Sequence, residues 1–352
     1  MRALVATRLG EIEMTEVEEP EIGPGQVLVE TMVTAVSAGT ELRMLYGRPG
    51  DVREHAPDFP VVGGFGYLAA GTVKAVGEGV EHVAVGDRVS AGRAWGAHRE
   101  ILDTDASSVI PIPNDMSFME AAASYWAVPP LAGILAGEPR VYSDTCVIGL
   151  GPLGLSAVQI LQPLSRRVLA VDIVERRIDV ARKFGAVGAN ANGEEVAAAI
   201  ESHMPAGPSV VVEASGTQAG LELALGIVRP KGKIALVGVP PPLNEIDLFW
   251  PMQHKGVHLV PLHRESAQSP QGGGKGSPRD TYLPDVLDMI SRGRLDIDSM
   301  TSWVVAAEDA PEAFQLLRQF PDKALGVGFA WVPEHASGVE RFEELRGSTA
   351  NR

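Results

Sequence analysis

A glycine-rich stretch between residues 149 and 154 has the spacing of a loop that holds the phosphates of a dinucleotide. It reads G-x-G-x-x-G, follows the apolar run Thr145–Ile148 and precedes the apolar-periodic run Leu155–Leu161. In such a unit the first glycine permits a tight turn, the second lets the backbone approach a pyrophosphate, and the third lets the helix pack closely on the strand. The free N–H groups at the start of the helix then face the phosphates. The residues predicted to contact the cofactor here are Gly149, Gly151, Pro152, Leu153 and Gly154.

An acidic residue follows this loop at the separation typical of a dinucleotide fingerprint. Asp172 ends the apolar run Arg167–Val171, which is the next predicted strand. Its carboxylate would accept hydrogen bonds from the adenosine ribose and would repel a 2′-phosphate, so the sequence favours NAD over NADP. The alternative is an ordinary glycine-rich connection between a strand and a helix. It is disfavoured because both the acid and the flanking pattern fit the fingerprint.

The composition limits the classes of partner. The 352 residues carry a formal net charge of −15, which argues against nucleic acid and anionic membranes as partners. No apolar run reaches membrane-spanning length, and the first residues lack the ordered regions of a signal peptide, so we expect a cytoplasmic protein. The single cysteine, Cys146, cannot form an internal disulfide bond and is expected to be a small buried residue.

The spacing of apolar runs and turn residues predicts two domains. Residues 1–125 are rich in glycine, proline and short β-prone runs, which indicates a mostly antiparallel β domain. Residues 126–264 alternate strands with amphipathic stretches, which indicates a doubly wound parallel sheet in an α/β fold. The strands expected in this second domain are Thr145–Ile148, Val168–Val171, Ser209–Glu213, Lys233–Val237 and Val257–Leu262.

The remaining residues, 265–352, are expected to return to the first domain. Tyr282–Arg292 and Ala310–Gln319 have helical patterns, and Gly326–Val332 has a strand pattern. The low-complexity stretch 264–280 predicts a flexible surface loop, with a lid over a ligand as the functional alternative. The polar tail after residue 334 is expected to be poorly ordered.

Further motifs occur in a fixed order along residues 1 to about 332. Besides the glycine loop and Asp172, they are Ser37–Glu41, Gly71–Gly77, Val85–Val89, Arg182–Ala186, Val212–Gly216 and Gly232–Gly238. On these motifs the sequence resembles the medium-chain dehydrogenase/reductase superfamily, which includes the zinc-type alcohol dehydrogenases. The resemblance implies a GroES-like, mostly antiparallel β catalytic domain into which a Rossmann domain is inserted, with nicotinamide and substrate in a cleft between them. It also implies a homodimer or homotetramer.

The resemblance adds contacts to the cofactor beyond the glycine loop. In family members the loop after the acidic residue surrounds the adenosine ribose, and the ends of later strands lie at the edge of the sheet where ligands bind. The residues at these positions are Ile173, Arg177, Ser215, Gly216, Val237, Gly238 and Val239.

The departures from the family bear most on the chemistry. Zinc-dependent members supply three protein ligands, which include a cysteine and a histidine, and leave one position open. Here Ala38 stands at the cysteine position, Tyr67 stands at the histidine position, and the third position falls near Tyr125 and Trp126. The four-cysteine structural zinc lobe is absent too, because Cys146 is the only cysteine. The sequence therefore predicts a member that binds no metal.

Without zinc, side chains must handle the proton of an alcohol substrate. Thr40 matches the hydroxyl that relays this proton in the family, and Tyr67 could hydrogen-bond a substrate oxygen. Glu41 could act directly as a base or could form an ion pair with Arg43. Arg43 matches a distal position of the relay, where it could lower a tyrosine pKa or stabilise an oxyanion. His98 is interpreted as a structural residue.

These features predict NAD-dependent interconversion of a secondary alcohol and a ketone. The segments Ser37–Glu41 and Gly66–Tyr67 are similar to a subgroup that includes bacteriochlorophyllide hydroxyethyl dehydrogenases and sugar or cyclitol dehydrogenases, which favours a hydroxylated substrate. One alternative is a metal-free enoyl or quinone reductase, but such relatives usually prefer NADPH and lack an acid at the position of Asp172. The other is a non-catalytic nucleotide-binding homologue, which the intact glycine loop and Thr40 disfavour.

Overall fold

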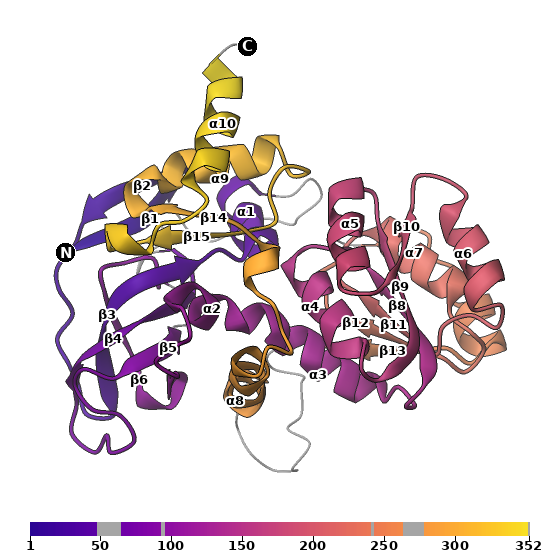
Figure 1. Ribbon diagram of the computed structural model, residues 1–352, viewed down its shortest axis with the longest axis horizontal. Coiled ribbons are helices and arrows are strands. Elements are labelled where there is room, and N and C mark those ends of the chain that lie inside the picture. The colour runs from indigo at the N-terminus through magenta and orange to yellow at the C-terminus, as the bar shows by residue number, and fades with distance from the viewer. Residues whose placement is uncertain (48–64, 93–95, 241–242, 263–277, 351–352) are drawn as a thin grey trace. The chain divides into compact units, whose positions relative to one another are not determined.

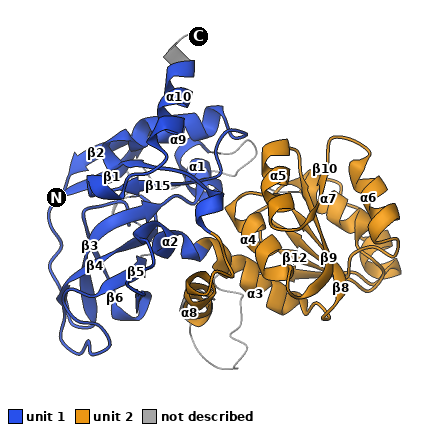
Figure 2. Cartoon of the chain, viewed as in Figure 1, with its two compact units in different colours: residues 1–125, 297–352 blue, residues 126–296 orange. Residues whose placement is uncertain are grey.

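The computed structural model describes residues 1–47, 65–92, 96–240, 243–262 and 278–350. The chain divides into two compact units, which are coloured separately in Figure 2. Unit 1 comprises residues 1–125 and 297–352, and unit 2 comprises residues 126–296. No helix in the described ranges is both long and apolar enough to cross a membrane.

The second boundary between the units differs from the one expected at residue 264. Helix α8, Pro278–Ser291, packs against helix α3, Val128–Gly137, and so stays with unit 2. Within the expected loop 264–280, residues 264–277 lie outside the described residues, and the last three residues are helical instead. The boundary was missed because a helix pattern alone does not indicate which domain its apolar face contacts.

Unit 2 contains a six-stranded parallel sheet in the order β10-β9-β8-β11-β12-β13 (Figure 1). This is the strand order of a doubly wound dinucleotide-binding sheet, and the order reverses between β8 and β11. The predicted α/β class is confirmed. The strands are β8 Ser143–Ile148, β9 Ser165–Asp172, β10 Val187–Asn190, β11 Val210–Glu213, β12 Lys233–Leu236 and β13 His258–Pro261. Of these, β10 was not predicted, because its sequence VGAN has little β-prone character.

Both faces of this sheet are covered, which explains why its strands read as continuous apolar runs. Alternate residues such as Cys146 and Val211 pack with α6 and α7, whose buried side chains include Val196 and Leu221. Helices α3 and α4 contact each other and the central strands. The helices of unit 2, besides α3 and α8, are α4 Pro152–Leu161, α5 Glu175–Lys183, α6 Glu195–His203 and α7 Gln218–Ile227.

Unit 1 is built on a seven-stranded sheet in the order β14-β15-β3-β4-β5-β7, with β6 also paired to β3, and on a separate hairpin of β1 and β2. Its strands are β1 Arg2–Arg8, β2 Glu11–Glu16, β3 Gln26–Ala35, β4 Leu68–Val76, β5 Arg88–Gly92, β6 Ile101–Asp105, β7 Val109–Pro111, β14 Thr301–Ala306 and β15 Gly326–Ala330. Its helices are α1 Ala38–Tyr46, α2 Phe118–Ala123, α9 Ala310–Gln319 and α10 Val339–Ala350.

The C-terminal tail is ordered as a helix, contrary to the expectation of a poorly ordered polar tail. Helix α10 packs on β14 and α9. Its Phe342 is fully buried, with its ring centroid 5.8 Å from that of Trp303. One buried aromatic side chain contributes enough apolar area to hold a short amphipathic helix against the domain. The prediction was wrong because it considered only the polar composition of the tail.

Candidate functional site

The glycine loop of unit 2 has the close backbone contacts that its glycines predict. Gly149 has φ +87°, and its N–H donates to the carbonyl of Val171 at 2.8 Å. A Cβ atom on Gly149 would lie 2.5 Å from the backbone N of Ser215, and one on Gly154 would lie 1.8 Å from the carbonyl oxygen of Gly149. Neither position therefore accepts a side chain. A Cβ on Gly151 would meet no atom within 4 Å, which leaves open space where the backbone would approach a phosphate.

Helix α4 begins directly after this loop, with Gly151 at its N-cap and Pro152 in its first turn. Proline suits this position because its missing N–H would have no helical partner there. The remaining N–H groups and the positive end of the helix dipole face the loop, an arrangement that suits a pyrophosphate.

Asp172, which is predicted to bind the adenosine ribose, also accepts hydrogen bonds from the backbone of the glycine loop. Its side chain is only 5% exposed. One carboxylate oxygen, Oδ2, accepts from the N–H of Leu150 at 2.6 Å, and Oδ1 accepts from the N–H groups of Ile173 and Val174 at 2.8 and 2.9 Å. The Nη1 atom of Arg177 lies 3.8 Å from Oδ2. A carboxylate has about four acceptor positions, so capacity remains for a ribose hydroxyl.

The ends of β11 and β12 bring the other predicted cofactor residues together. Glu213, a buried residue that sequence reasoning did not single out, accepts from the N–H groups of Ser215 and Gly216 at 2.9 and 3.2 Å and from the Ser215 hydroxyl. Burial raises the pKa of Glu213, against these hydrogen bonds, which lower it. A Cβ on Gly238 would lie 2.3 Å from the backbone N of Gly216, so the two strand ends lie against each other. The predicted residues Ser215, Gly216, Val237, Gly238 and Val239 therefore lie at one edge of the sheet.

In unit 1 the structure brings Thr40 and Tyr67 together and adds Ser37, which the sequence reasoning missed. Helix α1 carries Thr40, and Tyr67 directly precedes β4. The Tyr67 hydroxyl donates to the Ser37 hydroxyl oxygen at 2.5 Å, and it also hydrogen-bonds the Thr40 side chain. Burial raises the pKa of Tyr67 to about 12, although the bonds to Ser37 and Thr40 lower it. We call Ser37, Thr40 and Tyr67 the hydroxyl cluster.

Glu41 lies in the core of unit 1, where its carboxylate is not exposed to a substrate. It is fully buried, its Oε2 lies 2.9 Å from Nε2 of His98, and its Oε1 accepts from the N–H of Ser37 at 2.8 Å. A carboxylate engaged on both oxygens in a core is not available to a substrate, so the direct-base interpretation is corrected. The other interpretation was an ion pair between Glu41 and Arg43. In the structure the side-chain partner of the Glu41 carboxylate is His98. Arg43 is half-buried on the same helix.

The hydroxyl cluster does not fit a zinc ion. Zinc in proteins is bound by thiolate, imidazole and carboxylate groups. Ala38 supplies no donor, and the phenol of Tyr67, with a pKa of about 12, stays neutral at ordinary pH. Within the described ranges, no three His, Cys, Asp or Glu side chains gather as a metal-binding group. At the position of the histidine ligand this chain therefore has the phenol of Tyr67, and at the position of the cysteine ligand it has the methyl group of Ala38.

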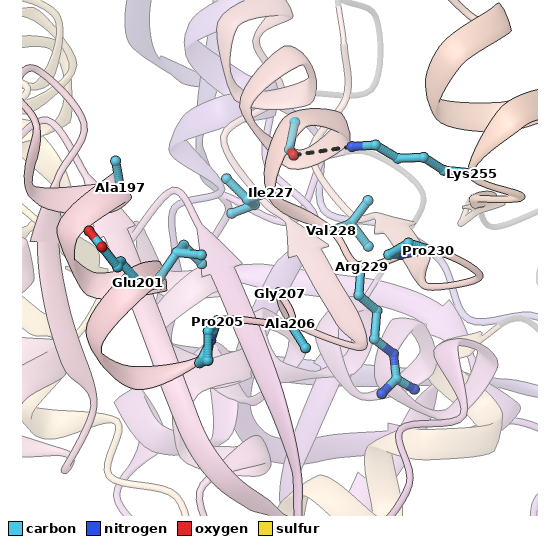
Figure 3. A pocket seen from close by; sticks show the side chains of 12 residues that line it. Ala197, Glu201, Pro205, Ala206, Gly207, Ile227, Val228, Arg229, Pro230 and Lys255 are labelled. Carbon is cyan, nitrogen blue, oxygen red and sulfur yellow. Dashed lines mark hydrogen bonds between the residues drawn. The ribbon is translucent and has the colours of Figure 1, made fainter.

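Unit 2 contains a hollow of about 540 Å³ (Figure 3), whose lining includes no residue of the glycine loop. It is lined by residues of α6, by the turn before β11 and by the residues before β12, so it lies at the amino ends of these strands. Ligands of doubly wound sheets bind at the opposite, carboxyl ends. Lys255 at its border donates to the carbonyl of Gly226 at 3.5 Å, in keeping with a structural role.

Comparisons with known proteins match both units. Residues 23–114 match the alcohol dehydrogenase GroES-like domain family, and residues 152–271 match the zinc-binding dehydrogenase family. The L-threonine 3-dehydrogenase of Idiomarina loihiensis is 30% identical over 70% of this chain and 81% of its own length. The alcohol dehydrogenase of Geobacillus stearothermophilus is 28% identical over 81% of this chain and 94% of its own. The solved structure of alcohol dehydrogenase TADH from Thermus sp. ATN1 is 26% identical, with a TM-score of 0.80 over 94% of this chain and 99% of its own.

Proposed function

Because this chain belongs to the medium-chain dehydrogenase/reductase superfamily of zinc-type alcohol dehydrogenase-like proteins, we propose that it interconverts a secondary alcohol and a ketone with NAD and without zinc. Its relatives are named dehydrogenases of alcohols, which makes the chain an oxidoreductase that acts on CH–OH groups. The observation that carries the proposal is the hydroxyl cluster, in which Tyr67 stands at the position of the histidine ligand and Thr40 at the position of the proton-relay hydroxyl of zinc-dependent members.

Unit 2 supplies the residues that would hold the cofactor. The glycine loop and the start of α4 would bind the pyrophosphate, and Asp172 would accept from the adenosine ribose. The negative charge of Asp172 favours NAD, since a 2′-phosphate would be repelled. When bound, the nicotinamide would supply the acceptor for the hydride of the alcohol.

Unit 1 supplies the proton chemistry. Tyr67 is a neutral donor whose hydroxyl is already held by Ser37 and Thr40. Such preoriented hydroxyl groups can hydrogen-bond the oxygen of an alcohol or ketone and, in the oxidation, relay the proton of the alcohol along the cluster to solvent water. In this proposal Thr40 and Tyr67 contact the substrate oxygen, while Glu41 holds α1 in place and Arg43 adds positive charge nearby.

We further propose a hydroxylated substrate of the sugar, cyclitol or natural-product class, and a homodimer or homotetramer as the assembled form. The substrate class rests on the likeness of Ser37–Glu41 and Gly66–Tyr67 to the subgroup named above. The assembly rests on family resemblance.

The proposal is tested by a screen of secondary alcohols, including sugars and cyclitols, with NAD⁺ and NADP⁺ in parallel, in which absorbance of the reduced cofactor is followed. We expect turnover of a polyhydroxylated alcohol with NAD⁺. Reduction of an enone by NADPH in the absence of any alcohol turnover would identify a C=C reductase instead. Tight nucleotide binding with no turnover of either class would identify a non-catalytic homologue.

Zinc independence has its own test. Protein purified from zinc-supplemented medium should contain zinc far below one equivalent by elemental analysis, and a chelator should leave kcat within about twofold, because the hydroxyl cluster offers no anionic ligand. The control is the variant with Ala38→Cys and Tyr67→His, which restores two of the family's ligand types and should retain more zinc. Stoichiometric zinc in the unaltered protein, removed together with activity, would contradict the proposal.

A further inference from the structure

A continuous chain of buried side-chain hydrogen bonds runs through the core of unit 1. The Nε1–H of Trp331 donates to Oγ1 of Thr34 at 3.2 Å, and Oγ1 lies 2.8 Å from Nδ1 of His98. The chain continues from Nε2 of His98 to Oε2 of Glu41 at 2.9 Å, and from Oε1 of Glu41 to the N–H of Ser37 at 2.8 Å. Trp331, Thr34, His98 and Glu41 are all buried. We call this the His98 chain.

One tautomer of His98 gives every hydrogen bond of the His98 chain both a donor and an acceptor. If Nε2 of His98 carries the hydrogen, it donates to the Glu41 carboxylate, and Nδ1 accepts from the hydroxyl of Thr34. The hydroxyl oxygen of Thr34 can then accept from the indole N–H of Trp331, which can only donate. Every side-chain donor and acceptor along the path then has a partner.

The surroundings of His98 are otherwise apolar. Its ring lies 5.2 Å from the ring of Phe329 and 6.4 Å from the rings of Phe65 and Phe314, measured between centroids. Gly66, with φ +78°, makes room for the imidazole, since a Cβ atom there would lie 2.3 Å from Cδ2 of His98. A polar ring in such a setting is costly unless its hydrogen bonds are made, and a carboxylate left without its partner would cost more.

The chain ends where the hydroxyl cluster begins. Glu41 reaches back to the N–H of Ser37, which is the N-cap residue of α1, and so fixes the first turn of this helix. Thr40 lies in the same turn, and the hydroxyls of Ser37 and Thr40 hold Tyr67. The position of the cluster is therefore set by Glu41, and that of Glu41 by His98.

We propose that His98 is a positioning residue for the alcohol chemistry, which acts through Glu41 to hold the first turn of α1 and with it the hydroxyls of Ser37 and Thr40. The proposal rests on the proposed function. His98 does not touch the substrate.

The test compares two substitutions that each retain one half of the imidazole. The amide nitrogen of His98→Gln can reach the place of Nε2 and donate to Glu41, whereas the amide of His98→Asn reaches only the place of Nδ1, beside Thr34. We expect kcat to fall about 10- to 100-fold in His98→Asn and to stay within about fivefold in His98→Gln, because small displacements of a reacting group are costly. The KM for NAD should not change in either, since the cofactor residues belong to unit 2.

The matched control is Ser90→Ala. It removes a different buried hydrogen bond of unit 1, from the Ser90 hydroxyl to the carbonyl of Ala121. Its melting temperature should fall, while kcat stays within about twofold. Thr34→Val removes the two bonds that the Thr34 hydroxyl makes, to Trp331 and to His98, but keeps the bond from His98 to Glu41. It therefore provides a milder variant if His98→Asn does not fold, and its kcat should fall less but in the same direction.

A readout independent of activity separates this proposal from the proposed function. Amide hydrogen exchange at Ser37, followed by NMR, should accelerate in His98→Asn and be largely restored in His98→Gln. If the unaltered protein turns over no alcohol, the proposed function fails, and the exchange data still decide whether His98 fixes this turn. If the protein is active but the Gln and Asn variants lose kcat equally, or lose none, or if exchange at Ser37 is the same in both, the positioning role is wrong.

Discussion

Asp172→Asn should lower kcat/KM for NAD about 10- to 100-fold relative to kcat/KM for NADP. The substitution removes the negative charge of the carboxylate that we propose accepts from the ribose hydroxyls and repels a 2′-phosphate. Hydrogen bonds to charged groups contribute about 1.5–3 kcal/mol, and each 1.4 kcal/mol is a factor of ten, which sets the expected range. The measurement is steady-state kinetics with both cofactors on one alcohol substrate.

The two cofactors serve as controls for each other, because Asp172 has two roles. Its carboxylate also accepts from the N–H of Leu150, so the substitution disturbs the glycine loop. Damage to the loop alone would weaken NAD and NADP by the same factor. Loss of ribose recognition changes their ratio, so an unchanged ratio would contradict the assignment of Asp172 as the selective residue.

Arg177 offers a second check on the same residue. Its Nη1 atom lies 3.8 Å from Oδ2 of Asp172, and its guanidinium would face a 2′-phosphate once the carboxylate is neutral. The double variant Asp172→Asn with Arg177→Ala should therefore lose whatever NADP activity the single variant gains. NADP activity that survives the second substitution would place the phosphate contact elsewhere.

The spacing of Asp172 from the glycines was enough to predict its place, but not its contacts. Spacing along the chain gives the strand end on which a residue lies, because parallel strands end at one edge of a sheet. It does not give the direction of the side chain, and so the bonds from Asp172 and Glu213 to neighbouring N–H groups could not be predicted. Both acids accept hydrogen bonds from the backbone of the loops that are proposed to bind the cofactor, and only Asp172 falls at a position that the dinucleotide fingerprint predicts.

The same limit applies to unit 1. The motif positions of Thr40 and Tyr67 predicted two members of the hydroxyl cluster, whereas Ser37 belonged to the motif Ser37–Glu41 without an assigned role. The pairing of Glu41 with His98 joins residues 57 positions apart in the chain. Local patterns carry no information on such a contact. Gly66 makes room for the ring of His98 in the structure, but it lies far from His98 in the chain and so gave no signal of the contact.

The fold was predictable where the apolar residues follow a strong pattern. It was not predictable where the placement of a helix depends on a single packing contact. The strands of unit 2, other than β10, were expected from their apolar runs. The assignment of α8 to unit 2 and the ordering of α10 depend on which surface a helix covers, and that is a property of the packed structure. Both errors concern the segment after residue 264, where the sequence has the weakest pattern.

Removal of both substrate-facing hydroxyls, in Thr40→Val with Tyr67→Phe, should lower kcat about 10²- to 10⁴-fold, the range that a positioned proton donor or acceptor supplies. The loss should be nearly uniform between about pH 7 and pH 10, because the pKa of Tyr67 is raised to about 12 and the phenol stays protonated throughout this range. The control is Tyr46→Phe, which removes a phenol hydroxyl from α1, the helix that carries Thr40, and should leave kcat within about threefold.

The raised pKa of Tyr67 gives the sign of a second pH effect. A phenol whose pKa is higher in the folded than in the unfolded protein stabilises the fold fully below the unfolded value of about 10, and this contribution is lost as the pH rises toward 12. Alkaline unfolding should therefore be less steep in Tyr67→Phe than in the unaltered protein. If Tyr67→Phe instead removed only the alkaline limb of the kcat profile, the phenol would titrate within the working range. It would then act as a base, and the neutral donor proposed for the hydroxyl cluster would be wrong.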